Sequence, residues 1–121
     1  MEDFIEREGR RYKAVCNSYE VVEYQGTKAV LSEHQNVALF RLGKECFALN
    51  NTCPHQRYDL MCEGVVDRDT VTCPMHGWQF NIRSGAEITN LGRIRTFETI
   101  EENGVVYVLD QSDELPSWAR E

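Results

Sequence analysis

Two short segments of the chain each place a cysteine close to a histidine. They read Cys-Pro-His over residues 53–55 and Cys-Pro-Met-His over residues 73–76, and seventeen residues separate His55 from Cys73. Two thiolates and two imidazoles form a ligand set that suits a soft or borderline metal. Each segment follows a β run and should lie in a loop, where its proline restricts the backbone. We therefore expect a fold that brings two loops together around one metal centre.

The spacing within the first segment bears on which metal is bound. Paired ligands in zinc sites are typically spaced as C-x₂₋₄-C and H-x₃₋₅-H. A single residue separates Cys53 from His55, which is a tight fit for two ligands of one tetrahedral ion. The spacing suits ligands of two neighbouring metals, as in a [2Fe–2S] cluster, where each loop gives a cysteine to one iron and a histidine to the other. Such mixed ligation is that of a Rieske centre. A structural zinc site remains the alternative.

Short β runs separated by turns make up most of the remaining chain. Gly43-Lys44 separates two of these runs, and Glu101-Glu102-Asn103-Gly104 separates another two, so both pairs are predicted to be hairpins. One short helical turn is expected within Asn17–Glu23. The fold class is therefore all-β, with eight to ten strands. The clearest expected strands are Tyr12–Val15, Thr27–Leu31, Val37–Leu42, Glu45–Leu49, Thr70–Thr72, Trp78–Ile82, Arg95–Ile100 and Val105–Leu109.

Length and charge exclude several classes of function. The chain has 121 residues, enough for one domain with a core of its own, and a formal net charge of −7. This charge argues against binding to nucleic acid or to anionic membranes, because both depend on Lys and Arg. The sequence has neither an apolar run of about 20 residues nor the apolar core of a secretory signal, so we expect a cytoplasmic protein. The polar ends, residues 1–9 and 111–121, are expected to fray.

The two ligand segments also carry a resemblance to a known family. After the second segment come Gly77-Trp78-Gln79-Phe80 and then Ser84-Gly85. Together with the C-x-H and C-x-x-H segments, this pattern resembles the Rieske domain family and looks most like the soluble Rieske-type ferredoxins. The resemblance covers residues 12–109. It implies an all-β fold of stacked antiparallel sheets in a single domain over residues 1–121, with a core from about 10 to 110 and a small cluster-binding subdomain at about 51–93.

The resemblance implies a ligand set. By analogy with the family, Cys53 and Cys73 ligate one iron of a single [2Fe-2S] cluster, and His55 and His76 ligate the other. An electron added to such a cluster goes to the iron held by the imidazoles. Exchange of two thiolates for histidines raises the potential above that of an all-cysteine cluster.

The resemblance also implies a function and partners. A protein of this kind carries single electrons between a flavin-containing reductase and a terminal acceptor such as a Rieske oxygenase. We expect weak, transient docking near His55 and His76. The chain leaves no room for the separate mononuclear-iron domain of such oxygenases, so we expect an electron carrier and not an enzyme. Two alternatives remain, namely the small subunit of a nitrite reductase, which frequently lacks the ligands, and a structural zinc module that serves as an interaction domain.

The chain departs from the family pattern at positions that affect the potential and the exposure of the cluster. High-potential Rieske proteins have a disulfide between the ligand loops, whereas the matching positions here are Tyr58 and Met75. Trp78 and Phe80 stand where those proteins place hydroxyl groups near the cluster sulfurs. We therefore expect a potential at the low end of the Rieske range. The stretch Gln56-Arg57-Tyr58-Asp59 is bulkier than is usual after the first histidine, and Asn90-Leu91-Gly92-Arg93 lacks the proline of the loop that often covers the cluster.

The remaining cysteines have simpler interpretations. Cys16 and Cys46 are expected to be small buried side chains. Cys62 lies nine residues after Cys53 and could approach the cluster, but packing is the favoured interpretation. For Trp78 and Phe80, which alternate on an expected strand, core packing is the default.

Overall fold

The chain folds into short strands with very little helix. The computed structural model describes residues 4–32, 35–52, 61–74, 77–89 and 92–110, and within these it has eleven strands and two 3₁₀ helices. The strands are β1 (Phe4–Arg7), β2 (Arg10–Asn17), β3 (Thr27–Ser32), β4 (Gln35–Leu42), β5 (Glu45–Asn50), β6 (Val65–Asp67), β7 (Thr70–Thr72), β8 (Gln79–Asn81), β9 (Thr96–Phe97), β10 (Thr99–Glu102) and β11 (Val105–Leu109). The helices are η1 (Ser18–Glu20) and η2 (Met61–Glu63).

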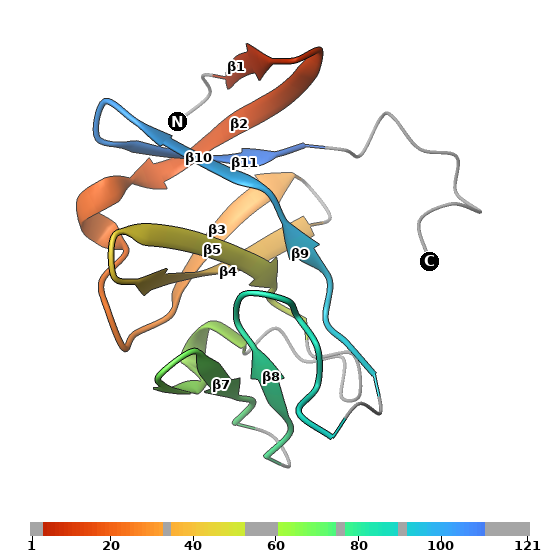
Figure 1. The fold of residues 1–121 in the computed structure, drawn as a ribbon. Coiled ribbons are helices and arrows are strands. Elements are labelled where there is room, and N and C mark those ends of the chain that lie inside the picture. Colours follow the sequence, from red (N-terminus) through yellow and green to blue (C-terminus); the bar gives the residue numbers. More distant parts are fainter. Residues whose placement is uncertain (1–3, 33–34, 53–60, 75–76, 90–91, 111–121) are drawn as a thin grey trace.

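The strands form three antiparallel sheets. Sheet A has the order β1-β2-β11-β10, sheet B has the order β3-β4-β5-β9, and sheet C has the order β6-β7-β8. Sheet C, drawn in green in Figure 1, lies at the end of the molecule opposite to β1. Its three strands come between β5 and β9 in the sequence, so both connections to sheet C leave from neighbouring strands of sheet B. The architecture confirms the predicted all-β class of stacked antiparallel sheets.

The central strand of sheet B, β4, is buried on both faces. Successive residues of a strand point to opposite faces, yet Val37, Ala38, Leu39 and Phe40 all have exposures of 1% or less. Val37 and Leu39 pack in a core between sheets A and B, which we call the first core. Ala38 and Phe40 pack in a core between sheets B and C, the second core. This double burial explains why β4 has a nearly continuous apolar sequence.

The second core attaches sheet C to the rest of the molecule. From sheet B it receives Phe40 of β4 and Leu49 of β5, and both are almost completely buried. From the part of the chain between β5 and β9 it receives residues that are all 1% exposed or less. These residues are Met61, Val71, Cys73, Phe80, Ile82 and Ile94.

The expected strands and the short helical turn are confirmed, with differences at three places. Residues 1–9 were expected to fray, but β1 pairs with β2 across a turn in which Glu8 and Gly9 both have positive φ, and Arg11 stacks on the Phe4 ring at 5.5 Å. Strand β6 was not expected from the sequence, and it pairs with β7 over three residues. The expected strand Arg95–Ile100 divides at Glu98, where the chain passes from sheet B to sheet A.

An ion pair joins sheets A and B at one end of the first core. The Arg41 guanidinium on β4 donates to both carboxylate oxygens of Glu101 on β10, with Nη1–Oε1 at 2.9 Å and Nη2–Oε2 at 3.0 Å. It also donates to the carbonyls of Val21 and Ser18, each at 3.0 Å. The Arg41 and Glu101 side chains are only 14% and 27% exposed. These hydrogen bonds from Arg41 lower the pKa of Glu101 below its ordinary value.

We expect Glu101→Gln to lower the free energy of unfolding at pH 7 by about 1–3 kcal/mol, because the charge-assisted pair with Arg41 is lost. A carboxylate whose pKa is lowered by folding stabilises above its unfolded pKa of about 4.3, and this contribution disappears as the pH falls through the folded value. The difference between wild type and Glu101→Gln should therefore shrink below about pH 4.3. Urea unfolding followed by circular dichroism between pH 7 and pH 3.5 measures it.

The control for this prediction is Glu102→Gln, which removes the exposed ion pair of Glu102 with Arg7. Exposed pairs contribute little, so this variant should stay within about 1 kcal/mol of wild type. Other acid-sensitive groups are the same in both proteins and cancel in the difference. A gap between wild type and Glu101→Gln that does not change with pH would contradict the assignment.

Candidate metal centre

Cys73 follows directly after β7 and lies inside the second core. Its exposure is 1%, whereas the next residue, Pro74, is exposed. The Cys73 amide donates a hydrogen bond to the carbonyl of Trp78 at 2.7 Å. Gly77 adopts a φ of 73°, a left-handed conformation that favours glycine. The second ligand segment is therefore a short loop whose two ends are held together at the tip of the β7–β8 hairpin.

The side chains of Trp78 and Phe80 attach this hairpin to the second core. Phe80 on β8 is fully buried, and Trp78 is partly buried and packs against the second core. Core packing, the default expectation for both residues, is thus confirmed. Neither side chain carries a hydroxyl group, so neither can donate an O–H hydrogen bond to a sulfur atom nearby.

The ends of the first ligand segment are also joined. The Asn51 carbonyl accepts a hydrogen bond from the Met61 amide at 3.0 Å, which closes the chain from residue 52 to residue 60 into a loop. On one side of the loop, the Asn50 side chain accepts from the Thr52 amide at 3.0 Å. On the other side, the Met61 side chain is completely buried in the second core. The described residues on either side of both ligand segments are therefore held in place, either by the second core or by the strands next to it.

A third turn lies in the same part of the chain, after β8. The Glu87 amide donates to the carbonyl of Gly92 at 3.0 Å, and the Glu87 carboxylate accepts from the backbone amide of Thr89 at 3.0 Å and from its hydroxyl. Glu87 is only 3% exposed, whereas Ile88 beside it is 54% exposed. The carboxylate thus stabilises a turn that begins with an exposed apolar side chain. Part of the Asn90–Arg93 stretch lies outside the described residues.

The structure describes one of the four predicted ligands. Cys73 is described, while Cys53, His55 and His76 lie outside the described residues. Met75, His34 and the bulky stretch 56–59 also lie outside them. What the structure does provide is the buried thiol of Cys73, which adjoins the exposed residues Pro74 and Gly77. A Cys₂His₂ donor set that includes this thiol fits a Rieske-type [2Fe–2S] cluster.

The other described cysteines are placed as expected. Cys16 and Cys46 are buried in the first core, away from sheet C. Burial raises the pKa of Cys16 to about 11 and that of Cys46 to about 12, so both remain thiols at neutral pH. Cys62, on η2, is half-buried against the second core, and burial raises the pKa of its thiol as well.

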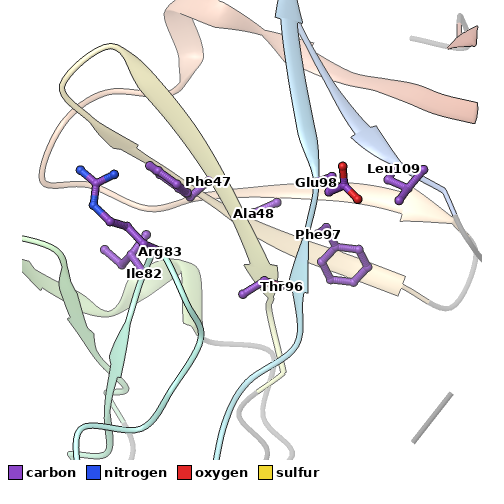
Figure 2. A pocket seen from close by; sticks show the side chains of 8 residues that line it. All are labelled: Phe47, Ala48, Ile82, Arg83, Thr96, Phe97, Glu98 and Leu109. Atoms are coloured by element: carbon purple, nitrogen blue, oxygen red, sulfur yellow. The ribbon is translucent and has the colours of Figure 1, made fainter. Parts of the chain in front are cut away.

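A pocket of about 320 Å³ lies between sheet B and the segment that follows β8. Figure 2 shows Phe47, Phe97 and Ile82 around it, with the charged groups of Arg83 and Glu98 on different sides. The Arg83 guanidinium lies over the Phe47 ring, 5.1 Å from its centre. None of the eight residues that line this pocket belongs to a ligand segment, so it is separate from the candidate metal centre.

Within the described residues, no helix has the length and apolar character needed to span a membrane.

Comparison with known proteins identifies relatives of the same fold. The ferredoxin CarAc of Metapseudomonas resinovorans is 34% identical over 74 residues, which are 60% of this chain and 68% of that protein. A chain in the complex of reduced oxygenase and oxidized ferredoxin in carbazole 1,9a-dioxygenase superposes with a TM-score of 0.73 at 26% identity, over 81% of this chain and 92% of that one. A Mycobacterium tuberculosis protein named as the small subunit of an NADH-dependent nitrite reductase has the same TM-score, 0.73, at 19% identity, over 90% of this chain and 97% of that one.

Other curated relatives are much longer, and the chain spans only 9% and 21% of two of them. The model of the Rieske [2Fe-2S] domain matches residues 11–101. This range includes both ligand segments and strands from all three sheets. The chain belongs to the Rieske [2Fe-2S] domain family, and this membership implies one Rieske-type [2Fe-2S] cluster.

Proposed function

We propose that the protein is a Rieske-type ferredoxin that carries single electrons between a flavin-containing reductase and a terminal acceptor such as a Rieske oxygenase. The observation that carries this proposal is the family match over residues 11–101, combined with the similarity to a ferredoxin over 68% of that ferredoxin's length. The similarity to a chain from an oxygenase–ferredoxin complex supports the choice of acceptor. In this function the chain itself turns over no substrate. The cytoplasmic location remains a prediction from the sequence.

The proposed ligands are Cys53 and Cys73 for one iron and His55 and His76 for the other. The buried position of Cys73 next to an exposed turn supports this assignment, as does the closure of both ligand segments on residues near the second core. When bound, the cluster supplies a site for one added electron. The second core would keep water away from the Cys73 thiolate, and the segment 51–93 would be the cluster-binding subdomain.

A second candidate function is the small subunit of a nitrite reductase. The observation that favours it is the shared fold with a protein of that name, which matches this chain over 97% of its own length. The presence of all four ligand residues in the sequence favours the ferredoxin. A stable complex with a large sirohaem-containing subunit would support the alternative, because an electron shuttle needs partners that dissociate.

We expect Cys73→Ser to abolish assembly of the cluster, because one iron loses a thiolate ligand. Wild-type protein should be brown-red as purified and contain iron and acid-labile sulfide, and the variant should be colourless. Iron and sulfide analysis with visible absorption provides the measurement. Cys46→Ala is the matched control, because it removes a buried thiol from the first core and should leave the cluster in place. Retention of the cluster in Cys73→Ser would refute the ligand assignment, and stoichiometric zinc in wild type would support the zinc module.

The midpoint potential should lie at the low end of the Rieske range, roughly −150 mV. Hydrogen bonds to the cluster sulfurs stabilise the added electron, and Trp78 and Phe80 carry no hydroxyl to donate. A redox titration of the purified protein followed by visible circular dichroism measures the potential. Phe80→Tyr introduces a hydroxyl at one of these positions and should raise it. A clearly positive potential in wild type would contradict the expectation.

Reduction by the partner reductase should slow as the ionic strength rises. A chain with a net charge of −7 is attracted to a basic docking patch, and salt screens this attraction. Arg57 follows the proposed ligand His55 closely, so Arg57→Ala should change the rate of reduction. Arg7→Ala, which removes the same charge from β1, at the end of the molecule opposite to sheet C, is the control (Figure 1). Rates that respond neither to salt nor to Arg57→Ala would place docking elsewhere.

A further inference from the structure

Two polar side chains are almost completely buried in the described part of the chain. They are Glu87, at 3% exposure, and Asn51, at 0%. An amide that is removed from water destabilises the fold unless its polar atoms find hydrogen-bond partners. Glu87 stabilises its own turn, as described above. Asn51 precedes the first ligand segment.

Asn51 makes three hydrogen bonds that join separate parts of the chain. Its backbone amide donates to the carbonyl of Asn36 on β4 at 3.2 Å. Its backbone carbonyl accepts from the Met61 amide at 3.0 Å, and its side-chain Oδ1 accepts from the Cys62 amide at 2.8 Å. One residue therefore ties the start of the central strand β4 to the first two residues of η2. The loop that it closes, residues 52–60, contains Cys53 and His55.

The helix η2 is also fixed from its other sides. A Cβ atom on Gly26, which precedes β3, would lie only 2.2 Å from the carbonyl oxygen of Cys62, so the two backbones are in direct contact. Met61 is completely buried in the second core, and the Gly64 amide donates to the Met61 carbonyl at 3.0 Å. The contacts with Gly26 and with the second core prevent η2 from moving in those two directions. The hydrogen bonds to Asn51 therefore determine the position of Met61, just after the loop, relative to Asn51, just before it.

This arrangement bears directly on the ligands. Cys53 is only two residues from Asn51 in the sequence, so we expect the position of Asn51 to influence that of the proposed ligand. A metal site needs its ligands held to within about 0.5 Å, and groups that orient ligands change metal retention by about 10- to 100-fold when they are removed. The backbone bonds of Asn51 are available to any residue, whereas the bond to the Cys62 amide requires an acceptor on the side chain.

We propose that Asn51 is a positioning residue of the cluster, whose side-chain oxygen holds the Cys62 amide and thereby fixes both ends of the loop that carries Cys53 and His55. This inference rests on the proposed function, because it takes these two residues as ligands. It predicts more than a loss of stability. Removal of the acceptor must alter the geometry and the retention of the cluster.

The test compares Asn51→Ala with Asn51→Asp, which keeps an acceptor oxygen of the same shape. In Asn51→Ala, the reduced protein should give an altered electron paramagnetic resonance spectrum, and a chelator should remove iron at least about tenfold faster than from wild type. Hydrogen exchange at the Cys62 amide should accelerate in the same variant, with or without the cluster. In Asn51→Asp, protection of the Cys62 amide and the rate of iron loss should return toward the wild-type values.

Two further variants separate positioning from general stability. Thr99→Val removes a side-chain hydrogen bond of 2.8 Å to the carbonyl of Cys46, far from sheet C, and should lower stability without changing the spectrum or the iron loss. Gly26→Ala displaces Cys62 from the opposite side while Asn51 stays intact. Gly26→Ala should alter the spectrum and speed the loss of iron. If Asn51→Ala does not fold, this variant tests whether the position of Cys62 affects the cluster.

The possible results separate a failure of this proposal from a failure of the proposed function. Wild-type spectra and iron retention in Asn51→Ala, with only a lowered stability, would overturn the proposal and leave Asn51 a structural residue. The same result in Gly26→Ala would also count against it. Wild-type protein that contains no iron or acid-labile sulfide would instead contradict the proposed function itself.

Discussion

The burial of β4 on both faces is the constraint on which the rest of the structure depends. A strand covered on both sides cannot alternate apolar and polar residues, and the stretch from Val37 to Phe40 is apolar throughout. One face of this strand needs sheet A, and the other needs sheet C. The apolar surface that β4 removes from water therefore holds three sheets together, although sheet C alone has only three strands of three residues each.

The second core connects this constraint to the chemistry. Sheet C is too small to be stable by itself, so its position depends on Phe40 and Leu49 of sheet B. Cys73 belongs to the same core, and Met61 and Trp78 pack in it or against it at the ends of the two ligand segments. The residues that give sheet C its stability are thus the same ones that place the candidate ligand segments. If these segments hold the cluster as proposed, its retention should be coupled to the folding of this end of the molecule.

The packing between sheets A and B involves other groups. The Arg41–Glu101 pair joins these two sheets, and the buried thiols Cys16 and Cys46 lie in the first core. We expect variation in these groups to affect mainly stability, whereas variation at Asn51 and Cys73 should also affect the proposed cluster site.

Local sequence patterns predicted much of the fold. The Asn103-Gly104 turn is an example, because both residues have positive φ, as the two-residue hairpin turn that matches strand twist requires. The same reasoning missed the turn at Glu8 and Gly9, since Glu is not a residue that favours positive φ. It also missed the change of sheet at Glu98, because a strand that crosses from one sheet to another keeps its extended pattern.

By itself, the sequence determined the all-β class, the two Cys/His segments and their spacing, since these depend on residues that are neighbours in the chain. Only the tertiary structure decided that Glu101 is paired with Arg41 and that Asn51 meets Cys62. Each of these depends on the partner that folding brings to a side chain, and the partners here lie 11 and 60 residues apart in the sequence. No periodicity or short motif in the sequence predicts these contacts. They depend on how the three sheets pack around β4.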